Sequence, residues 1–236
     1  MADALAGRGV AWIWPVSNGP LARDGGSGSA GANRESAVLV ESLRIKADTV
    51  ERHPRTQPLV LASGVSVLPV VHVESDATSP NTWSPAQVDA LVAAFARHAP
   101  EAARGSGMIQ LDFEAPRRQR GAYVDLVGRL RTSLPARLRL SVTALAQWCA
   151  EGGWLDELPV DEVVPMLYRL GPHAAAWRAR WSDPQAPLAR ACQGPALGFA
   201  TNDPPPFPLL ARTRRPYFFD EAAWSDPSRS TAQDLP

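Results

Sequence analysis

The stretch "MIQLDFEAP", residues 108–116, alternates apolar and polar side chains and ends in a proline. Successive side chains of a β-strand point to opposite faces, so Gln110, Asp112 and Glu114 share one face of a strand and the apolar residues share the other. Two carboxylates on one face repel each other, and where water is partly excluded one of them keeps its proton to a higher pH than a free carboxyl group does. The stretch therefore predicts a strand with a functional pair of carboxylates at its C-terminal end.

Helical patterns flank this strand on both sides. Residues 84–99 begin with Ser84 as a helix N-cap and Pro85 at the first helical position, followed by an apolar stripe with helical spacing. The same spacing recurs over residues 119–134, and a third helical pattern covers residues 172–181. We therefore expect helices before and after the carboxylate-bearing strand.

Short apolar or β-branched runs recur along the whole chain, and several of the intervals between them have helical patterns. This alternation predicts a parallel sheet, and eight strands suggest a closed barrel. The expected strands are residues 10–16, 37–43, 65–73, 108–114, 138–145, 162–168, 196–201 and 216–220. The predicted fold class is α/β, a single minimal (β/α)8 TIM-type barrel with some helices shortened or replaced by loops. An open doubly wound sheet is the alternative.

The length of 236 residues is typical of one barrel domain, because α/β barrels commonly run to about 200–250 residues without splitting. We therefore expect a single domain over residues 1–236. Residues 17–36 are rich in Gly and Ser and are expected to form a flexible loop. The prolines of residues 202–208 prevent a helix from starting there, and residues 225–236 are expected to form a loose tail.

Composition and charge exclude several classes of protein. Hydrophobic residues make up 45% of the chain and charged residues 20%, as in a globular protein. The formal net charge is zero, so no electrostatic footprint for nucleic acid or an anionic membrane is present. No stretch reaches the roughly 18 consecutive apolar residues of a membrane span. No cofactor motif is recognised, and nothing in the pattern indicates an oligomeric state.

The two cysteines, Cys149 and Cys192, are far apart and outside any Cys-x-x-Cys spacing. Neither a zinc site nor a disulfide is indicated, so both are expected to be small buried residues. The first residues lack the basic and apolar regions of a signal peptide. The chain as it stands is therefore expected to be cytoplasmic, or periplasmic if a leader has been removed.

Polar residues recur at the C-terminal ends of the expected strands, where barrel enzymes carry their chemistry. A carboxylate on the inward face of a strand costs several kcal/mol unless it is paired, which favours a functional site. For Glu41 or Asp220 alone, a helix cap or a solvated rim position is the stronger interpretation, and His72 fits a core histidine equally well. Trp12 and Trp14 fit packing better than a platform for sugar rings.

Two of these strands resemble motifs of a known family. The sequence "IQLDFEAP" resembles the end of the Asp-x-Asp-x-Glu strand motif of chitinase-like glycoside hydrolases, and "PMLY" resembles their Met-x-Tyr. The resemblance implies that Glu114 protonates the glycosidic oxygen, that Asp112 orients the N-acetyl group of the substrate, and that Tyr168 hydrogen-bonds that group. It also implies that the substrate itself supplies the nucleophile.

This chain departs from that motif at three positions. Gly107 and Gln110 stand where the motif has two earlier aspartates, and Arg169 stands where an Asp usually follows the Tyr. The blocks "LPVVHVE", "QLDFEAP", "SVTALAQWC" and "LPVDEVVPMLYRLG" together are more similar to an uncharacterised bacterial family that carries only a domain-of-unknown-function label. That resemblance covers residues 37–220 and implies the barrel without an established substrate.

Three functional hypotheses follow. The leading one is a glycoside-hydrolase-like barrel with a carbohydrate ligand, and the second is a carbohydrate-binding barrel without turnover. The third is a metal-dependent hydrolase, because oxygen-rich clusters suit Mg, Ca or Mn. In the leading hypothesis the catalytic residues are Glu114, Asp112 and Tyr168. The expected substrate-binding residues are Glu41, His72, Glu74, Gln110, Thr143, Arg169 and Asp220.

Overall fold

The chain forms a closed parallel β-barrel in the computed structural model, which describes residues 9–14, 35–76, 78–151, 153–203, 209 and 213–219. Its strands are β1 (Val10–Ile13), β2 (Glu35–Ile45), β4 (Ser66–Ser75), β5 (Met108–Asp112), β6 (Arg139–Leu145), β7 (Glu162–Met166), β8 (Ala196–Ala200) and β9 (Arg215–Phe219). Neighbouring strands pair in the order β1-β9-β8-β7-β6-β5-β4-β2, and pairing of β1 with β2 closes the ring. The predicted TIM-type barrel is confirmed, and the open sheet is wrong.

One strand was not expected. β3 (Val50–Pro54) pairs antiparallel with β2 and lies at the edge of the sheet, in place of a helix between the second and third barrel strands. Its sequence "VERHP" is mostly exposed and lacks the alternation that marks a half-buried strand. Charged side chains and a proline are features that protect a sheet edge from pairing with another chain.

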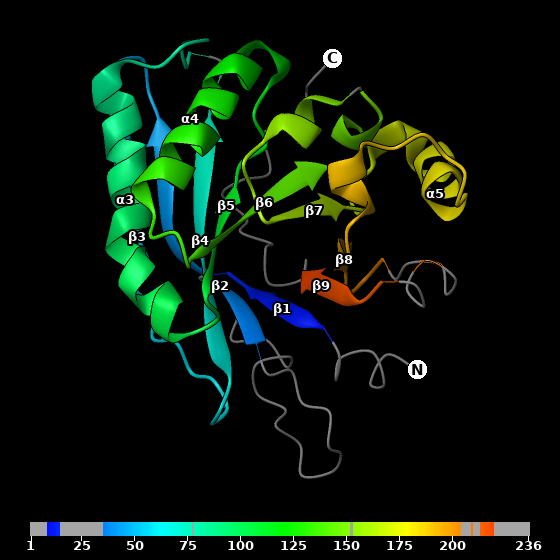
Figure 1. Ribbon diagram of the computed structural model, residues 1–236, viewed down its shortest axis with the longest axis horizontal. Helices are drawn as coiled ribbons and strands as arrows, with labels where there is room; N and C mark the ends of the chain where they lie inside the picture. Colours follow the sequence, from blue (N-terminus) through cyan, green and yellow to red (C-terminus); the bar gives the residue numbers. More distant parts are fainter. Residues whose placement is uncertain are drawn as a thin grey trace.

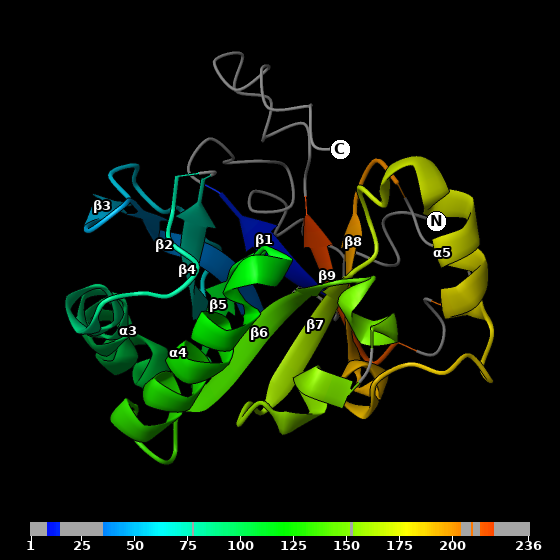
Figure 2. The ribbon, with the colours of Figure 1, turned by 90° about the horizontal axis from the view of Figure 1, so that it is seen from above.

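Three α-helices of the described residues follow the predicted patterns. They are α3 (Pro85–Arg104), α4 (Arg120–Ser133) and α5 (Ala174–Ser182). Ser84 caps α3, and its side chain and that of Gln87 bond each other's backbone N–H. Figures 1 and 2 show α3 and α4 side by side on one flank of the barrel and α5 on the opposite flank. Short 3-10 helices follow several of the other strands, as expected of a minimal barrel.

Strand alternation divides the buried residues into two cores. On β5, Ile109 and Leu111 face α3 and α4, whereas Met108 faces the barrel interior. The interior core also contains Trp12 and Tyr217. Each large apolar side chain that is fully buried contributes about 1.5–3 kcal/mol to folding, so the two cores together hold the strands in register.

The two cysteines correct the sequence interpretation. Both are buried, as expected, but Cys149 and Cys192 form a disulfide, which their spacing in the sequence does not indicate. They are 43 residues apart in the sequence, yet their Cα atoms are 5.8 Å apart. The loop after β6 and the segment before β8 meet on the outside of the barrel, and no local spacing in the sequence reveals that meeting.

Several expectations lie outside the described residues: most of the 17–36 loop, most of residues 202–208, the 225–236 tail and Asp220. In the part of the chain that is described, no helix is both long enough and apolar enough to cross a membrane.

Candidate active site

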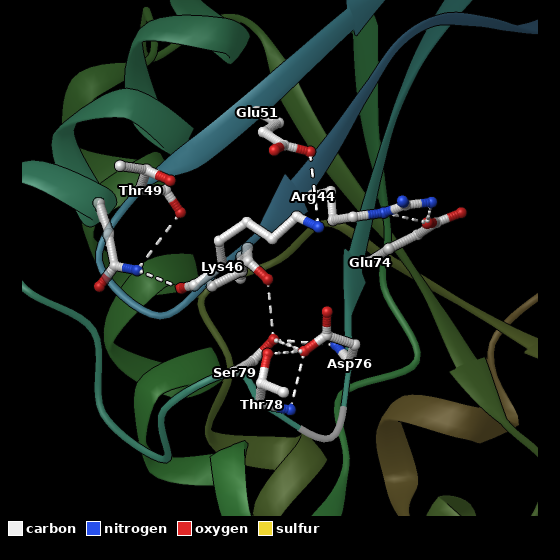
Figure 3. Close-up of polar contacts among 10 residues, drawn as sticks. Arg44, Lys46, Thr49, Glu51, Glu74, Asp76, Thr78 and Ser79 are labelled. Atoms are coloured by element: carbon white, nitrogen blue, oxygen red, sulfur yellow. Dashed lines mark hydrogen bonds and ion pairs between the residues drawn. The ribbon is translucent and has the colours of Figure 1, made fainter.

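β2 and β4 are longer than the other barrel strands and project past them at the C-terminal end. The ladder between β2 and β4 continues as far as Ile45, whereas the ladder between β4 and β5 ends where His72 pairs with Asp112. The projecting part forms a raised wall on one side of the barrel mouth. Figure 3 shows Arg44 and Glu74 on this wall, pointing toward one another from neighbouring strands.

The raised wall is braced by the loop that follows β4 and by the start of α3. The Ser79 hydroxyl donates to the Ile45 carbonyl at 2.8 Å, and the Gln87 amide donates to the Lys46 carbonyl at 2.9 Å. Lys46 also lies 3.7 Å from the Glu51 carboxylate across the β2–β3 hairpin (Figure 3). These bonds fix the position of the side chains that the wall presents to the mouth.

Asp112 belongs to a continuous polar chain. Its Oδ2 is 2.9 Å from His72 Nδ1, and its Oδ1 accepts a hydrogen bond from Thr143 Oγ1 at 2.7 Å. On the other side of the imidazole, His72 Nε2 is 3.3 Å from Glu74 Oε1. Arg44 then donates to Glu74 Oε2 from Nε at 3.3 Å and from Nη2 at 3.0 Å. The chain runs from the partly exposed wall to the buried Thr143, and we call it the mouth relay.

The mouth relay sets the protonation of its members. Burial lowers the pKa of His72, but the hydrogen bonds and charges of Asp112 and Glu74 outweigh it and raise that pKa to about 9. Burial raises the pKa of Asp112, but His72 and Thr143 outweigh it, so the pKa of Asp112 is lowered. At neutral pH His72 is therefore an imidazolium between two carboxylates, and Asp112 is ionised.

Glu114 follows the end of β5 at the rim and remains accessible to solvent. Its pKa is raised, first because surrounding protein atoms displace water and second because Asp112 is negatively charged. The positive charges of His72 and Arg169 oppose this shift without reversing it. The two carboxyl groups of "LDFE" therefore titrate apart, and Glu114 keeps its proton to the higher pH.

A small pocket, partly open to solvent, lies in the barrel mouth. Its volume of about 10 Å³ is room for about one water molecule, so a ligand would lie across its opening and not inside it. Its apolar lining comes from Trp12, Trp14, Ala37, Leu39, Val70 and Met166, and its polar lining from Asp112, Thr143 and Tyr168. Asp112 thus faces the pocket, as the strand alternation predicts.

Aromatic rings form another part of the rim. The ring of Tyr168 stacks on Phe219 with centroids 5.5 Å apart and planes at 14°, and its hydroxyl donates to the Met166 sulfur at 3.2 Å. Trp14 packs edge-on against His72 with centroids 5.0 Å apart. Rings with an apolar face and a polar tip suit a ligand that carries both kinds of group.

Arg169, directly after Tyr168, has an unusual backbone. Its φ of 51° makes it the one non-glycine residue with positive φ in the described part of the chain. This conformation costs roughly 1–2 kcal/mol and is often found at functional sites. The guanidinium carbon lies 5.8 Å from the centre of the Phe219 ring, so the strained residue places a cation at the aromatic rim.

Glu41 is not part of the site at the barrel mouth. A β-bulge separates the pairing of Leu39 from that of Glu41, and the extra residue turns the carboxylate to the outer face. There it lies 2.6 Å from Arg52 Nε, 2.9 Å from Arg97 Nη2 and 2.9 Å from His98 Nε2. Burial raises the pKa of Glu41, but these three partners outweigh it and lower that pKa. Glu41 therefore lies in an outer cluster beneath α3, away from the pocket.

Gln110 faces the barrel interior but lies below the pocket, is fully buried, and is bonded to Trp12 and Ser141. Arg44 was missed, because the second strand was expected to end two residues after Glu41. The alternation of apolar and polar residues continues through "SLRI", and following it to Ile45 would have found Arg44.

The metal hypothesis rested on His72 and its neighbouring carboxylates. Both ring nitrogens of His72 already face carboxylate oxygens. Across the described ranges, no group of three or more His, Cys, Asp and Glu side chains is placed to hold a metal ion. The described geometry therefore offers this hypothesis no coordination site.

Comparison with known proteins adds little to this geometry. No protein-family model and no curated protein matches the chain. Among solved structures, the spore cortex-lytic enzyme SleL of Bacillus cereus is similar, with a TM-score of 0.41 and 16% sequence identity over 71% of this chain and 43% of that one. This chain thus matches less than half the length of SleL. A similarity this distant does not say which reaction, if any, this chain performs.

Proposed function

We propose that this chain is a glycoside-hydrolase-like barrel protein that acts on a polysaccharide or oligosaccharide, with Glu114 as the general acid and Asp112 as its charged partner. One observation supports the proposal most directly. Two carboxyl groups two residues apart have pKa values displaced in opposite directions, that of Asp112 downward and that of Glu114 upward. Such a pair supplies a proton donor and a fixed negative charge within one site.

In the proposed reaction Glu114 donates its proton to the glycosidic oxygen as the bond from that oxygen to the sugar carbon breaks. The leaving sugar departs as an alcohol, and positive charge develops on the sugar that remains. Ionised Asp112 stabilises that charge from the pocket. By the resemblance to chitinase-like enzymes, the acetamido oxygen of the substrate attacks the sugar carbon as that bond breaks, and Tyr168 hydrogen-bonds the same group. A water molecule that gives its proton to Glu114 then displaces the acetamido oxygen from the sugar carbon, which releases the second sugar and restores the acid.

His72 and Glu74 were expected to contact the substrate, but we assign them another role. In this proposal they are positioning residues, because His72 holds Asp112 in its ionised form and Glu74 holds His72. Thr143 supports the other carboxylate oxygen. Arg169 at the aromatic rim stays a proposed ligand contact.

A carbohydrate-binding protein without turnover is the second candidate, and one observation favours it. Both carboxylate oxygens of Asp112 already bond to protein groups, so turning the carboxylate toward a substrate would break at least one of those bonds. A site of this kind would bind a sugar without the freedom to assist its cleavage.

The test is a hydrolysis and binding screen with chitohexaose, cellohexaose, xylohexaose and a wider panel of polysaccharides. We expect Glu114→Gln to lower turnover by about 10²–10⁴-fold while substrate affinity is kept, because the amide cannot donate the proton as an acid does. Glu101→Gln is the matched control, since Glu101 is exposed on α3, and its turnover should equal that of the wild type.

The outcomes separate the two candidates. Binding without turnover in the wild type supports the second candidate over the first. Turnover that survives unchanged in Glu114→Gln removes the acid from the mechanism. If no sugar in the panel is bound or cleaved, both candidates are wrong.

A further inference from the structure

The segment between β6 and β7 lies where a TIM-type barrel usually has a helix. We call residues 146–151 and 153–161 the β6–β7 segment. It contains two short 3-10 helices, Trp148–Ala150 and Gly153–Glu157, and no α-helix among its described residues. The hydrogen bonds of 3-10 helices are poorly aligned, so these turns add little stability of their own. Contacts with neighbouring elements must therefore hold the segment in place.

Three ties bind the β6–β7 segment to the residues that precede β8. The first is the disulfide between Cys149 and Cys192. The second is the Cys149 carbonyl, which accepts a hydrogen bond from the Ala189 N–H at 2.7 Å. The third is the Asp156 carboxylate, which accepts from two backbone N–H groups at the start of the 3-10 helix Arg190–Gln193, at 2.6 and 3.2 Å. The disulfide is the covalent tie of the three.

The same segment carries two tryptophans of an aromatic layer on the outer face of the barrel. Trp148 and Trp154 each pack edge-on against the buried Tyr123 of α4, with ring centroids 5.9 and 6.0 Å apart. Tyr123 in turn lies against Phe113, with centroids 5.9 Å apart. Phe113 separates the two carboxyl groups of the candidate site in the sequence. The layer therefore packs directly behind the end of β5.

The disulfide is enclosed by the fold. Cys149 is 1% exposed and Cys192 is 2% exposed. Exchange requires a thiolate to reach one of the two sulfur atoms, so an enclosed disulfide resists reductants while the chain is folded. The two cysteines are 43 residues apart, and linking residues this distant restricts the unfolded chain strongly. Disulfides of this kind persist in oxidising compartments and are rare where cellular thiols keep cysteines reduced.

We propose that the bond between Cys149 and Cys192 is a permanent clasp that keeps the β6–β7 segment and its aromatic layer packed behind β5, and that the chain folds in an oxidising compartment. Forming the bond removes two protons and two electrons from the two thiols, and a protein disulfide or oxidised glutathione accepts them. The proposal does not depend on the proposed function, because it concerns the stability and the redox state of the chain.

The experiment compares the oxidised full chain with the double variant Cys149→Ala and Cys192→Ala. We expect the double variant to melt about 5–15 °C lower, because its unfolded state is no longer restricted. Hydrogen exchange followed by mass spectrometry should be faster in peptides that cover residues 146–151 and 188–193. Peptides that cover α3 should exchange as they do in the oxidised chain. The double variant should not respond to dithiothreitol, and the wild type refolded in dithiothreitol should behave like it.

Alkylation of the denatured chain counts its thiols, and we expect none in the oxidised chain or in acid-quenched cells of the organism that makes it. Two thiols in the air-oxidised chain would mean that the clasp does not form. Two thiols only in those cells would overturn the oxidising compartment.

The other results test the local role of the clasp. A double variant that melts and exchanges like the oxidised wild type would show that the bond holds nothing in place. Exchange that rises equally in α3 would mean that the bond stabilises the whole barrel and not this segment. Should the double variant fail to fold, the wild type refolded in dithiothreitol supplies the same comparison.

Discussion

Two buried carboxylates, Glu41 on β2 and Asp112 on β5, each have a histidine partner, but the other charged groups around them differ. The outer cluster surrounds Glu41 with Arg52, Arg97 and His98. Positive groups are in excess there, so the pKa of Glu41 is lowered and the carboxylate stays ionised at neutral pH. Such a cluster can tie β2 and β3 to α3 and has no capacity left for chemistry.

The mouth relay has a different balance. Its two carboxylates, Asp112 and Glu74, are matched by the His72 imidazolium and the Arg44 guanidinium. No cation of the relay is left over for Glu114, whose pKa is raised. The comparison teaches that a surplus of cations, more than burial or the presence of histidine, separates the structural cluster from the candidate catalytic one.

The largest change in stability should come from removing the negative charge of Glu41 in the outer cluster. We expect Glu41→Gln to lower the free energy of unfolding by about 2–4 kcal/mol, because it leaves the guanidinium groups of Arg52 and Arg97 without their counter-charge. This loss is smaller than the roughly 5 kcal/mol that breaking a fully buried ion pair can cost, because the Arg52 and Arg97 side chains are 47% and 37% exposed. Sugar binding per folded molecule should be unchanged. Urea unfolding measures the loss.

Glu51→Gln is the control for that prediction, since Glu51 forms a half-exposed ion pair on the same hairpin and should cost less than about 1 kcal/mol. A Glu41→Gln variant that unfolds like the wild type, or that loses sugar binding while folded, would break the comparison between the two clusters.

The next effect is a difference in pH dependence. The pKa of His72 is about 9 in the folded chain against 6.5 for a free histidine, so its stabilising contribution is complete below pH 6.5 and is lost as the pH rises through 9. The lowered pKa of Glu41 works in the other direction, and its contribution is lost as the pH falls below 4.5. The mouth relay should therefore weaken in alkali and the outer cluster in acid.

Urea unfolding of the wild type and His72→Gln between pH 5 and pH 10 checks the alkaline limb. We expect the wild type to be more stable by on the order of 1–3 kcal/mol near pH 6, with the difference shrinking as the pH approaches 9. A difference that stays constant over this range would mean that His72 is neutral when folded.

The smallest effect should come from the uncharged end of the mouth relay. Thr143→Val removes one hydrogen bond to Asp112, which should raise the pKa of that carboxyl group and cost about 1 kcal/mol of stability or binding. Carboxyl NMR of Asp112 measures the pKa directly. Thr132→Val on the exposed face of α4 is the control and should change neither quantity. An unmoved Asp112 pKa would assign its ionisation to His72 alone.

The barrel and half of the candidate site follow from local patterns. The alternation of residues 108–112 places Asp112 inside and Leu111 outside, and the helical stripes place α3 and α4 against the outer face. The same reasoning failed at Glu41, because one bulged residue inverts every later position on the strand. It also failed for Cys149 and Cys192, whose meeting depends on two loops that follow different strands.

What the sequence determined by itself is the period of each segment, since backbone geometry dictates which side chains share a face over a few residues. The tertiary structure alone decided the partners. His72 meets Asp112 across 40 positions and Trp12 meets Gln110 across 98. A carboxylate in a cluster with surplus cations and one in a cluster with balanced charges look alike in a strand. The charge that each one feels is set by side chains that only barrel closure brings within reach.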